Sequence, residues 1–294
     1  MTAPQTRMID TGACRLCLHE WGADLRGQAP TLLLIHATGF HGRCWDQVVP
    51  YLGSRHVIAP DLRGHGQSDS APITDWRDLA GDLSGFLDAL GLTGVTAAGH
   101  SVGGATATLA ALARPDLFAK LILIDPVIMR PAGYETAQGR PAGAPEDHPV
   151  ARRRASFASV EAMRDQLGAK PPYVLFDAGV MEDYCRFGTE ETPEGARRLL
   201  CDPAFEASIY QTALAYADTH KVVRDLQTPA LVIRAQQPVN PEDFRDFRFS
   251  PTDPDLAAHL PRAHDLALPQ FTHFIPQQSP AFAAGLILAG EAML

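Results

Sequence analysis

The 294-residue chain lacks the features that several classes of protein require. It has no excess of positive charge, since Lys and Arg total 25 against 34 Asp and Glu, for a formal net charge of −9. Because an acidic chain is repelled by nucleic acid and by anionic membrane surfaces, we expect it to bind neither. No apolar run is long enough to cross a bilayer. The first ten residues lack the apolar core of a secretory signal, so a cytoplasmic location is expected.

Cysteine is scarce and odd in number, which argues against a disulfide framework. The five cysteines are Cys14, Cys17, Cys44, Cys185 and Cys201. The first two form a C-x-x-C pair, but residues three apart in an extended run point to opposite faces. No second pair completes a zinc site, and the glycines form no dinucleotide-binding pattern. We therefore expect no metal, nucleotide or flavin cofactor.

The chain does contain an alternation of apolar, β-prone runs and amphipathic helical runs. Strands are indicated at residues 13–21, 31–36, 56–60, 95–99, 121–125, 229–234 and 264–268, and helices at 45–52, 75–90, 102–113, 255–260 and 280–293. Several of the strand runs are apolar throughout, which is typical of strands buried on both faces. The alternation predicts an α/β fold with a mostly parallel, doubly wound sheet of about eight strands.

The alternation is interrupted in the middle of the chain. Residues 131–149 are rich in Pro, Gly and Ala and are interpreted as a mobile loop. Residues 151–223 show helical stretches and no clear strand. We interpret residues 128–223 as a helical cap inserted into an α/β core formed by residues 1–127 and 224–294. A cap that directly follows the end of a strand is well placed to cover a site at that edge of the sheet.

The segment Gly99-His100-Ser101-Val102-Gly103 matches the pattern G-x-S-x-G between an apolar run and an Ala-rich run. A sharp strand-to-helix turn at this place would strain the serine backbone and expose its hydroxyl. The glycines would avoid collisions with the neighbouring strand and helix. The amide of Val102 would begin the helix, where its N–H faces negative charge developing on a substrate. This context predicts Ser101 as a nucleophile.

Four motifs in order resemble the α/β-hydrolase fold superfamily. They are His36-Ala37-Thr38-Gly39-Phe40, Asp61-Leu62-Arg63-Gly64-His65-Gly66-Gln67-Ser68, Gly99-His100-Ser101-Val102-Gly103 and Thr272-His273-Phe274-Ile275-Pro276. The resemblance implies a serine nucleophile, an acid and a histidine base in that order, with Ser101 as nucleophile and His273 as base. It also implies an oxyanion hole formed by the amides of Thr38 and Val102, although Ala37 stands where the family usually carries glycine.

Two aromatic residues follow the first of these motifs. Phe40 and Trp45 either line the substrate pocket near the oxyanion hole or pack the first helix, and the sequence leaves both interpretations open.

The identity of the acid is also left open. The commonest family position follows the strand at residues 231–234, but this chain has no carboxylate there before Glu242 and Asp243. Some family members instead carry the acid at the end of the strand after the nucleophile helix, where this chain has Asp125. An unpaired carboxylate after an apolar strand would be costly, which predicts a partner such as His273. We favour Asp125 over Glu242, Asp243 and the carboxylates beyond them.

The resemblance implies hydrolysis of a small carboxylic ester or lactone through an acyl-enzyme on Ser101. Aromatic residues are frequent within residues 151–223, and some of them must form the core of that region. If the others face the cleft, they favour a substrate with an apolar or aromatic body. Hydrolysis of a carbon–carbon bond and cofactor-free peroxidation are alternatives on the same scaffold. An alternative of another class is a small-ligand binding protein without turnover.

Overall fold

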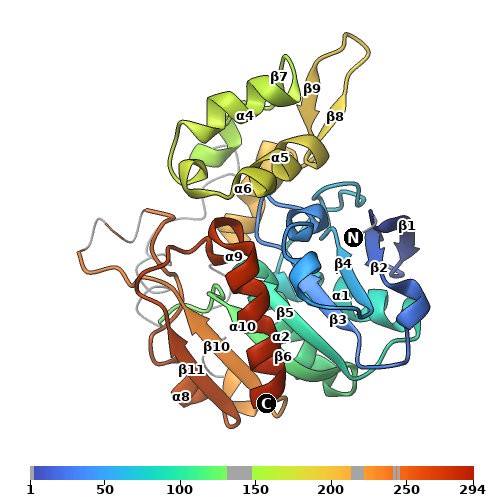
Figure 1. The fold of residues 1–294 in the computed structure, drawn as a ribbon, viewed down its shortest axis with the longest axis vertical. Coiled ribbons are helices and arrows are strands. Elements are labelled where there is room, and N and C mark those ends of the chain that lie inside the picture. The colour runs from blue at the N-terminus through green and yellow to red at the C-terminus, as the bar shows by residue number, and fades with distance from the viewer. Residues whose placement is uncertain (1–2, 131–147, 213–221, 241–242, 244–245) are drawn as a thin grey trace.

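The computed structural model describes residues 3–130, 148–212, 222–240, 243 and 246–294. Its core is an eight-stranded sheet with the strand order β1-β2-β4-β3-β5-β6-β10-β11 (Figure 1). β2 pairs antiparallel with both of its neighbours, and the other neighbouring strands pair parallel. The strands are β1 (Gln5–Asp10), β2 (Arg15–Trp21), β3 (Leu32–Ile35), β4 (Val57–Pro60), β5 (Val95–His100), β6 (Phe118–Ile124), β10 (Ala230–Arg234) and β11 (Ala263–Ala267). The mostly parallel α/β sheet expected from the sequence is confirmed.

Helices cover both faces of this sheet, as Figure 1 shows. α1 (Trp76–Leu90), α2 (Val102–Ala113) and α8 (Leu256–His259) pack on one face, and α10 (Pro280–Met293) packs on the other. The strand side chains alternate accordingly. In β6, Leu121 and Leu123 belong to the first face, whereas Ile122 and Ile124 belong to the second. The continuous apolar runs therefore reflect burial of both faces.

Short helical turns connect these elements. They are η1 (Ala23–Leu25), η2 (Gly42–Trp45), η3 (Val49–Tyr51), η4 (Pro115–Leu117), η6 (Pro149–Arg152), η7 (Tyr173–Leu175), η9 (Val223–Asp225) and α9 (Ile275–Gln278). The helix expected at residues 45–52 is thus a pair of 3₁₀ turns, because a proline at position 50 interrupts regular hydrogen bonding. Strand β1, which precedes the first expected strand, was not foreseen because its side chains are mostly exposed.

The inserted region contains α4 (Val160–Gly168), α5 (Ala178–Phe187) and α6 (Pro203–Thr212), which lie together above the core in Figure 1. It also contains a second sheet, in the order β7 (Ser156–Phe157), β9 (Arg197–Leu199) and β8 (Thr189–Glu191). The expectation that residues 151–223 hold no strand was therefore wrong. Strands of two or three residues are too short to produce a period-two pattern.

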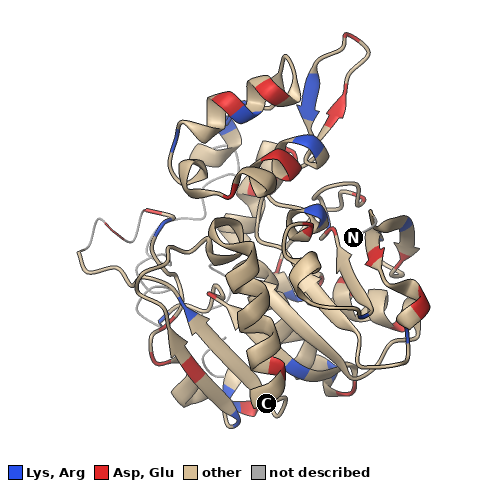
Figure 2. Cartoon of the chain, in the orientation of Figure 1, with Lys and Arg blue, Asp and Glu red and all other residues tan. Residues whose placement is uncertain are grey.

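Apolar residues of the inserted region pack against the core around Phe40 and Phe274. The loop expected at residues 131–149 lies almost entirely outside the described residues, and the domain boundaries proposed above stay predictions. Basic and acidic residues are interspersed over the cap and the core in the view of Figure 2. Among the described residues, none of the helices combines the length and the apolar character that crossing a membrane requires.

Candidate active site

Ser101 lies in the tight turn between β5 and α2. In the described part of the chain, Ser101 (φ 59°) and Asp125 (φ 46°) are the only non-glycine residues with positive φ. A Cβ on Gly99 would lie 2.5 Å from the carbonyl oxygen of Gly103, and a Cβ on Gly103 would lie 2.5 Å from the carbonyl oxygen of Ile35. Glycine at both positions therefore allows the turn that holds the strained serine.

Three side chains that are far apart in the sequence meet at this turn. The Oγ of Ser101 lies 3.0 Å from Nε2 of His273, and Nδ1 of His273 lies 2.6 Å from Oδ2 of Asp125. His273 precedes α9, and its backbone N–H donates to the carbonyl oxygen of Arg248 at 2.8 Å. The two ring nitrogens thus face different partners. In this arrangement an imidazole can accept the serine proton at one nitrogen while a carboxylate fixes its tautomer at the other.

Asp125 is completely buried at the end of β6. Its Oδ1 accepts hydrogen bonds from the backbone N–H of Ala235 at 2.9 Å, from Oγ of Ser250 at 2.5 Å and from Oγ1 of Thr252 at 3.3 Å. These donors compensate the buried carboxylate and leave Oδ2 to His273. Neither hydroxyl donor is predictable from the sequence, because both lie in an irregular segment that carries no local pattern.

Among the described residues, Asp243 bonds within its own loop rather than to His273. Oδ2 of Asp243 accepts from the backbone amides of Asn240 and Val239 at 2.8 and 3.0 Å, and these bonds hold the pKa of its carboxyl below its usual value. Glu242 lies outside the described residues. The structure thus brings Asp125 rather than Asp243 to the imidazole.

His36 anchors the loop that contains Thr38. Its Nε2 accepts from the backbone N–H of Leu62 at 2.8 Å, and its Nδ1 donates to the carbonyl oxygen of Ala37 at 2.8 Å. Burial, reinforced by the nearby His65, lowers the pKa of His36 to about 3, so the ring is neutral and its tautomer is fixed by these two bonds. Alanine is accommodated at position 37, where φ is not positive.

The two candidate oxyanion donors are the backbone amides of Thr38 and Val102. The carbonyl oxygen of Ala37 accepts hydrogen bonds from the His36 ring and from the Phe40 N–H. This carbonyl and the N–H of Thr38 belong to the same trans peptide unit, so they point in opposite directions. The Thr38 N–H is therefore directed away from both donors. Neither the Thr38 nor the Val102 N–H donates to another residue in the described part of the chain. Both are free to bind developing negative charge.

The two aromatic candidates lie in different parts of the molecule. Phe40 contacts the rings of Tyr184, Phe176 and Phe274, with centroids 5.2, 6.0 and 6.2 Å away. Trp45 is 1% exposed and packs in the core cluster on the α10 face of the sheet. Trp45 therefore packs in the core, whereas Phe40 lies where the loop that carries Thr38 meets the cap.

A small hollow, partly open to solvent, lies between this loop and the cap. Gly39 and Phe40 line it from the core, and Tyr184, Leu199 and Arg153 are among the residues that line it from the cap. Its walls combine apolar and aromatic groups with one guanidinium. Arg153 belongs to the run Arg152-Arg153-Arg154, which matches no site motif, so the sequence does not indicate its position at the hollow.

Arg153, which is partly exposed, forms an ion pair with a buried carboxylate of α6. Its Nη1 lies 2.9 Å from Oε2 of Glu206, which is 4% exposed. Burial raises the pKa of Glu206, and the positive charge of Arg153 opposes that change. A Cβ on Gly39 would lie 2.5 Å from Oε1 of Glu206, so this side chain packs directly on the loop that carries Thr38.

Comparison with known proteins gives a consistent result. Residues 32–284 match the model of a family described as "Alpha/beta hydrolase family". The chain is 42% identical over 98 residues to lipase LipV of Mycobacterium tuberculosis, covering 33% of this chain and 37% of that protein. It is 33% identical over 110 residues to (E)-2-((N-methylformamido)methylene)succinate hydrolase of Acinetobacter baylyi, covering 36% and 41%. These matches span well under half of either curated relative.

A solved structure resembles the fold over nearly its whole length. The crystal structure of E-2-(acetamidomethylene)succinate hydrolase superposes with a TM-score of 0.76 at 22% identity, covering 98% of this chain and 99% of that one.

Proposed function

The chain belongs to the alpha/beta hydrolase family, and from this premise we propose that it is a serine hydrolase of small carboxylic esters or lactones with an apolar or aromatic body. In this proposal Ser101 is the nucleophile, His273 the general base and Asp125 the acid. The observation that carries it is the pair of contacts through the two nitrogens of His273, at 3.0 Å to Ser101 and 2.6 Å to Asp125.

The reaction proceeds in two halves. Oγ of Ser101 attacks the ester carbonyl carbon while Nε2 of His273 takes its proton. The imidazolium then gives this proton to the departing alkoxide, which leaves as an alcohol and leaves the acyl group on Ser101. Water attacks the acyl carbon with His273 again as base, and the acid is released. The contact with Asp125 keeps the proton on Nδ1, so that Nε2 presents its lone pair to the serine.

Negative charge on the carbonyl oxygen is stabilised by the N–H groups of Thr38 and Val102. Two features support this role: both amides lack acceptors among the described residues, and Val102 is the first residue of α2.

The apolar substrate class is supported by the side chains around Phe40. The rings of Tyr184, Phe176 and Phe274 surround it, and the hollow beside it is lined in part by Leu199. Such walls exclude water from an acyl-enzyme and bind apolar groups.

A second candidate substrate class is an ester or amide that carries its own carboxylate. Arg153 at the hollow favours it, and two of the relatives named above are hydrolases of substituted succinates. Glu206 argues against it, since its carboxylate neutralises Arg153 at 2.9 Å. We therefore place the neutral substrate first.

The proposal is tested with p-nitrophenyl acetate, butyrate and benzoate. We expect a pre-steady-state burst of one p-nitrophenol per chain, because the acyl-enzyme forms before water releases it, and kcat/KM should rise from acetate to butyrate. Cys14→Ser serves as a variant outside the site. A chain that binds these esters with neither burst nor turnover would be a binding protein instead.

Methyl butyrate and monomethyl succinate separate the two substrate classes in a pH-stat assay. The neutral ester should be preferred by the wild type, and Glu206→Gln should shift the preference toward the acidic ester because it leaves Arg153 unneutralised. Preference of the wild type for monomethyl succinate would select the second candidate.

A further inference from the structure

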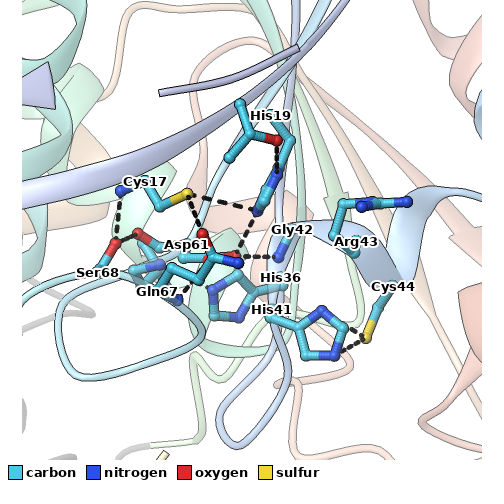
Figure 3. A network of polar contacts seen from close by, with 12 residues as sticks. Cys17, His19, His36, His41, Gly42, Arg43, Cys44, Asp61, Gln67 and Ser68 are labelled. Atoms are coloured by element: carbon cyan, nitrogen blue, oxygen red, sulfur yellow. Dashed lines mark hydrogen bonds and ion pairs between the residues drawn. The ribbon is translucent and has the colours of Figure 1, made fainter. Parts of the chain in front are cut away.

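A second group of reactive side chains lies where β2 meets the end of β4, and Figure 3 shows it at close range. Cys17 and His19 lie two residues apart in β2, so their side chains are on the same face of the sheet. The antiparallel register pairs Leu18 with Pro60, and the backbone N–H of Asp61 donates to the carbonyl oxygen of Cys17 at 2.8 Å. The strand pairing thus brings a thiol, an imidazole and a carboxylate together, and all three residues are at most 2% exposed.

The donor atoms of these side chains converge on one point. Nε2 of His19 lies 3.1 Å from Oδ1 of Asp61 and 3.9 Å from Sγ of Cys17, and all three donor atoms lie within 4.8 Å of one another. Oε1 of Gln67 lies 3.7 Å from the same sulfur. Zinc–ligand bonds of about 2.0–2.3 Å in a tetrahedron separate the donor atoms by roughly 3.3–3.6 Å. Small side-chain adjustments would therefore place the thiol, the imidazole and the carboxylate around one ion, with Oε1 of Gln67 beside the sulfur.

The arrangement does not suit nucleophilic catalysis. Nε2 of His19 faces both the thiol of Cys17 and the carboxylate of Asp61, while its Nδ1 faces Oγ1 of Thr6 at 3.2 Å. A catalytic imidazole needs its nucleophile and its acid on different nitrogens.

We propose that Cys17, His19 and Asp61 form a binding site for Zn²⁺ or a similar divalent transition metal, with Oε1 of Gln67 as the fourth donor. One thiolate and one carboxylate neutralise the charge of a divalent ion, which makes the loaded site neutral in the interior. Binding releases the thiol proton of Cys17 to solvent. His19 binds through Nε2 as a neutral imidazole with its proton on Nδ1.

The surroundings of His19 fit this change of tautomer. Oγ1 of Thr6 can donate to Nδ1 in the free protein and accept from Nδ1–H in the loaded one, because a hydroxyl does both. Metal-bound histidines usually donate their second N–H in this way. Thr6 lies on the exposed edge strand β1, directly opposite His19 in the register, so only one strand separates the site from solvent.

The sequence could not show this site. The C-x-x-C spacing suggests that Cys17 acts together with Cys14. The thiol of Cys14, however, interacts with Thr11 and Asp82 rather than with Cys17. The third donor, Asp61, is 44 residues further along the chain and reaches the site only through strand pairing.

Titration of the metal-free 294-residue chain with Co²⁺ tests the proposal. A cobalt–thiolate bond gives a near-ultraviolet charge-transfer band, and we expect this band to saturate at one ion per chain and to be displaced by Zn²⁺. Cys17→Ser should abolish it, whereas the matched control Cys14→Ser, on the same stretch of chain, should retain it. Thr6→Val should weaken Co²⁺ binding by about tenfold or more, because it removes the acceptor behind His19. No band in the wild type, or an unchanged band in Cys17→Ser, would overturn the proposal.

Two further measurements guard against misfolding of a variant. Asp61 also accepts from the backbone amides of Gly42 at 2.6 Å and Gln67 at 2.8 Å, so its substitution risks the fold and is not used. X-ray absorption of the Zn²⁺-loaded wild type should show one sulfur and several nitrogen or oxygen ligands, and a shell without sulfur would refute the site. Zn²⁺ should also raise the Tm of the wild type and of Cys14→Ser. These readouts are independent of hydrolysis, so their failure leaves the proposed function untouched.

Discussion

Among the described residues, two buried clusters place a histidine between a carboxylate and the side chain of a serine or a cysteine. In the first, Nδ1 and Nε2 of His273 face Asp125 and Ser101 at 2.6 and 3.0 Å. In the second, one nitrogen of His19 faces both Asp61 and Cys17, at 3.1 and 3.9 Å. The residue types are nearly the same, but opposed partners suit proton transfer, whereas convergent partners suit binding of a cation.

The backbone explains why the clusters differ. Ser101 and Asp125 both have positive φ, and they project from turns at the ends of β5 and β6. Cys17 and His19 are regular residues of β2, so their side chains lie parallel on one face. Strained turns place groups around a ring from different directions, whereas a regular strand presents them side by side.

From this comparison we expect the largest loss of kcat when the nucleophile is replaced. Ser101→Ala should lower kcat for p-nitrophenyl butyrate by about 10⁶-fold, and His273→Ala should do nearly the same, because the two act as a unit. The double variant should be no worse than either single variant. If the two losses in kcat multiply in the double variant, Ser101 and His273 act independently. That result would contradict the assignment of proton transfer to the first cluster.

The next effect distinguishes the acid. Asp125→Asn should lower kcat by about 10⁴-fold, because the imidazole loses the partner that fixes its tautomer. Asp243→Asn is the matched control and should remain within about twofold of the wild type, since its carboxylate bonds only to its own loop among the described residues. An Asp125→Asn variant with wild-type kcat would rule out Asp125 as the acid that acts on His273.

A smaller effect is expected at the loop that carries Thr38. Gly39→Ala places a Cβ 2.5 Å from Oε1 of Glu206 and should displace the Thr38 amide, lowering kcat by about 10²–10³-fold. Gly53→Ala is the control, because Gly53 has a similar positive φ, 77° against 78°, with nothing within 4 Å of its Cβ. Equal kcat losses in the two variants would indicate backbone strain alone rather than a displaced oxyanion donor.

The smallest effect concerns buried histidines that form no ion pair with a carboxylate among the described residues. Burial lowers the pKa values of His41 and His65 to about 4, so the unfolded chain binds more protons than the folded chain below about pH 6.5. Their contribution to stability is complete above that pH and falls by about 1.4 kcal/mol per histidine and pH unit as the pH drops toward 4. Urea unfolding at pH 7, 6 and 5 measures this slope, and His65→Gln should reduce it. An unchanged slope would contradict the assignment of a neutral, buried His65.

Much of this architecture could be predicted from the sequence. Helix α2 was placed at the observed bounds, because the glycines around Ser101 and the Ala-rich run that follows mark its start. The candidate acid was favoured because Asp125 ends an apolar strand and needs a buried partner. These features are local, so a linear pattern carries them.

The parts that the sequence could not supply depend on pairing between distant segments. Ser250 and Thr252 reach Asp125 from a loop more than 120 residues away, as the separations of 125 and 127 residues show. The pair of Arg153 with Glu206 joins two cap segments, and Asp61 reaches Cys17 through the pairing of β2 with β4. No periodicity or spacing encodes these contacts, because each depends on the packed fold.

Covalent labelling tests the central claim most directly. The protein is incubated with a serine-directed fluorophosphonate, and the adduct is located by peptide mass spectrometry. We predict one adduct per chain, on Ser101, formed far more slowly in His273→Ala and absent in Ser101→Ala. An adduct on another residue, or no adduct in the folded wild-type protein, would contradict the account.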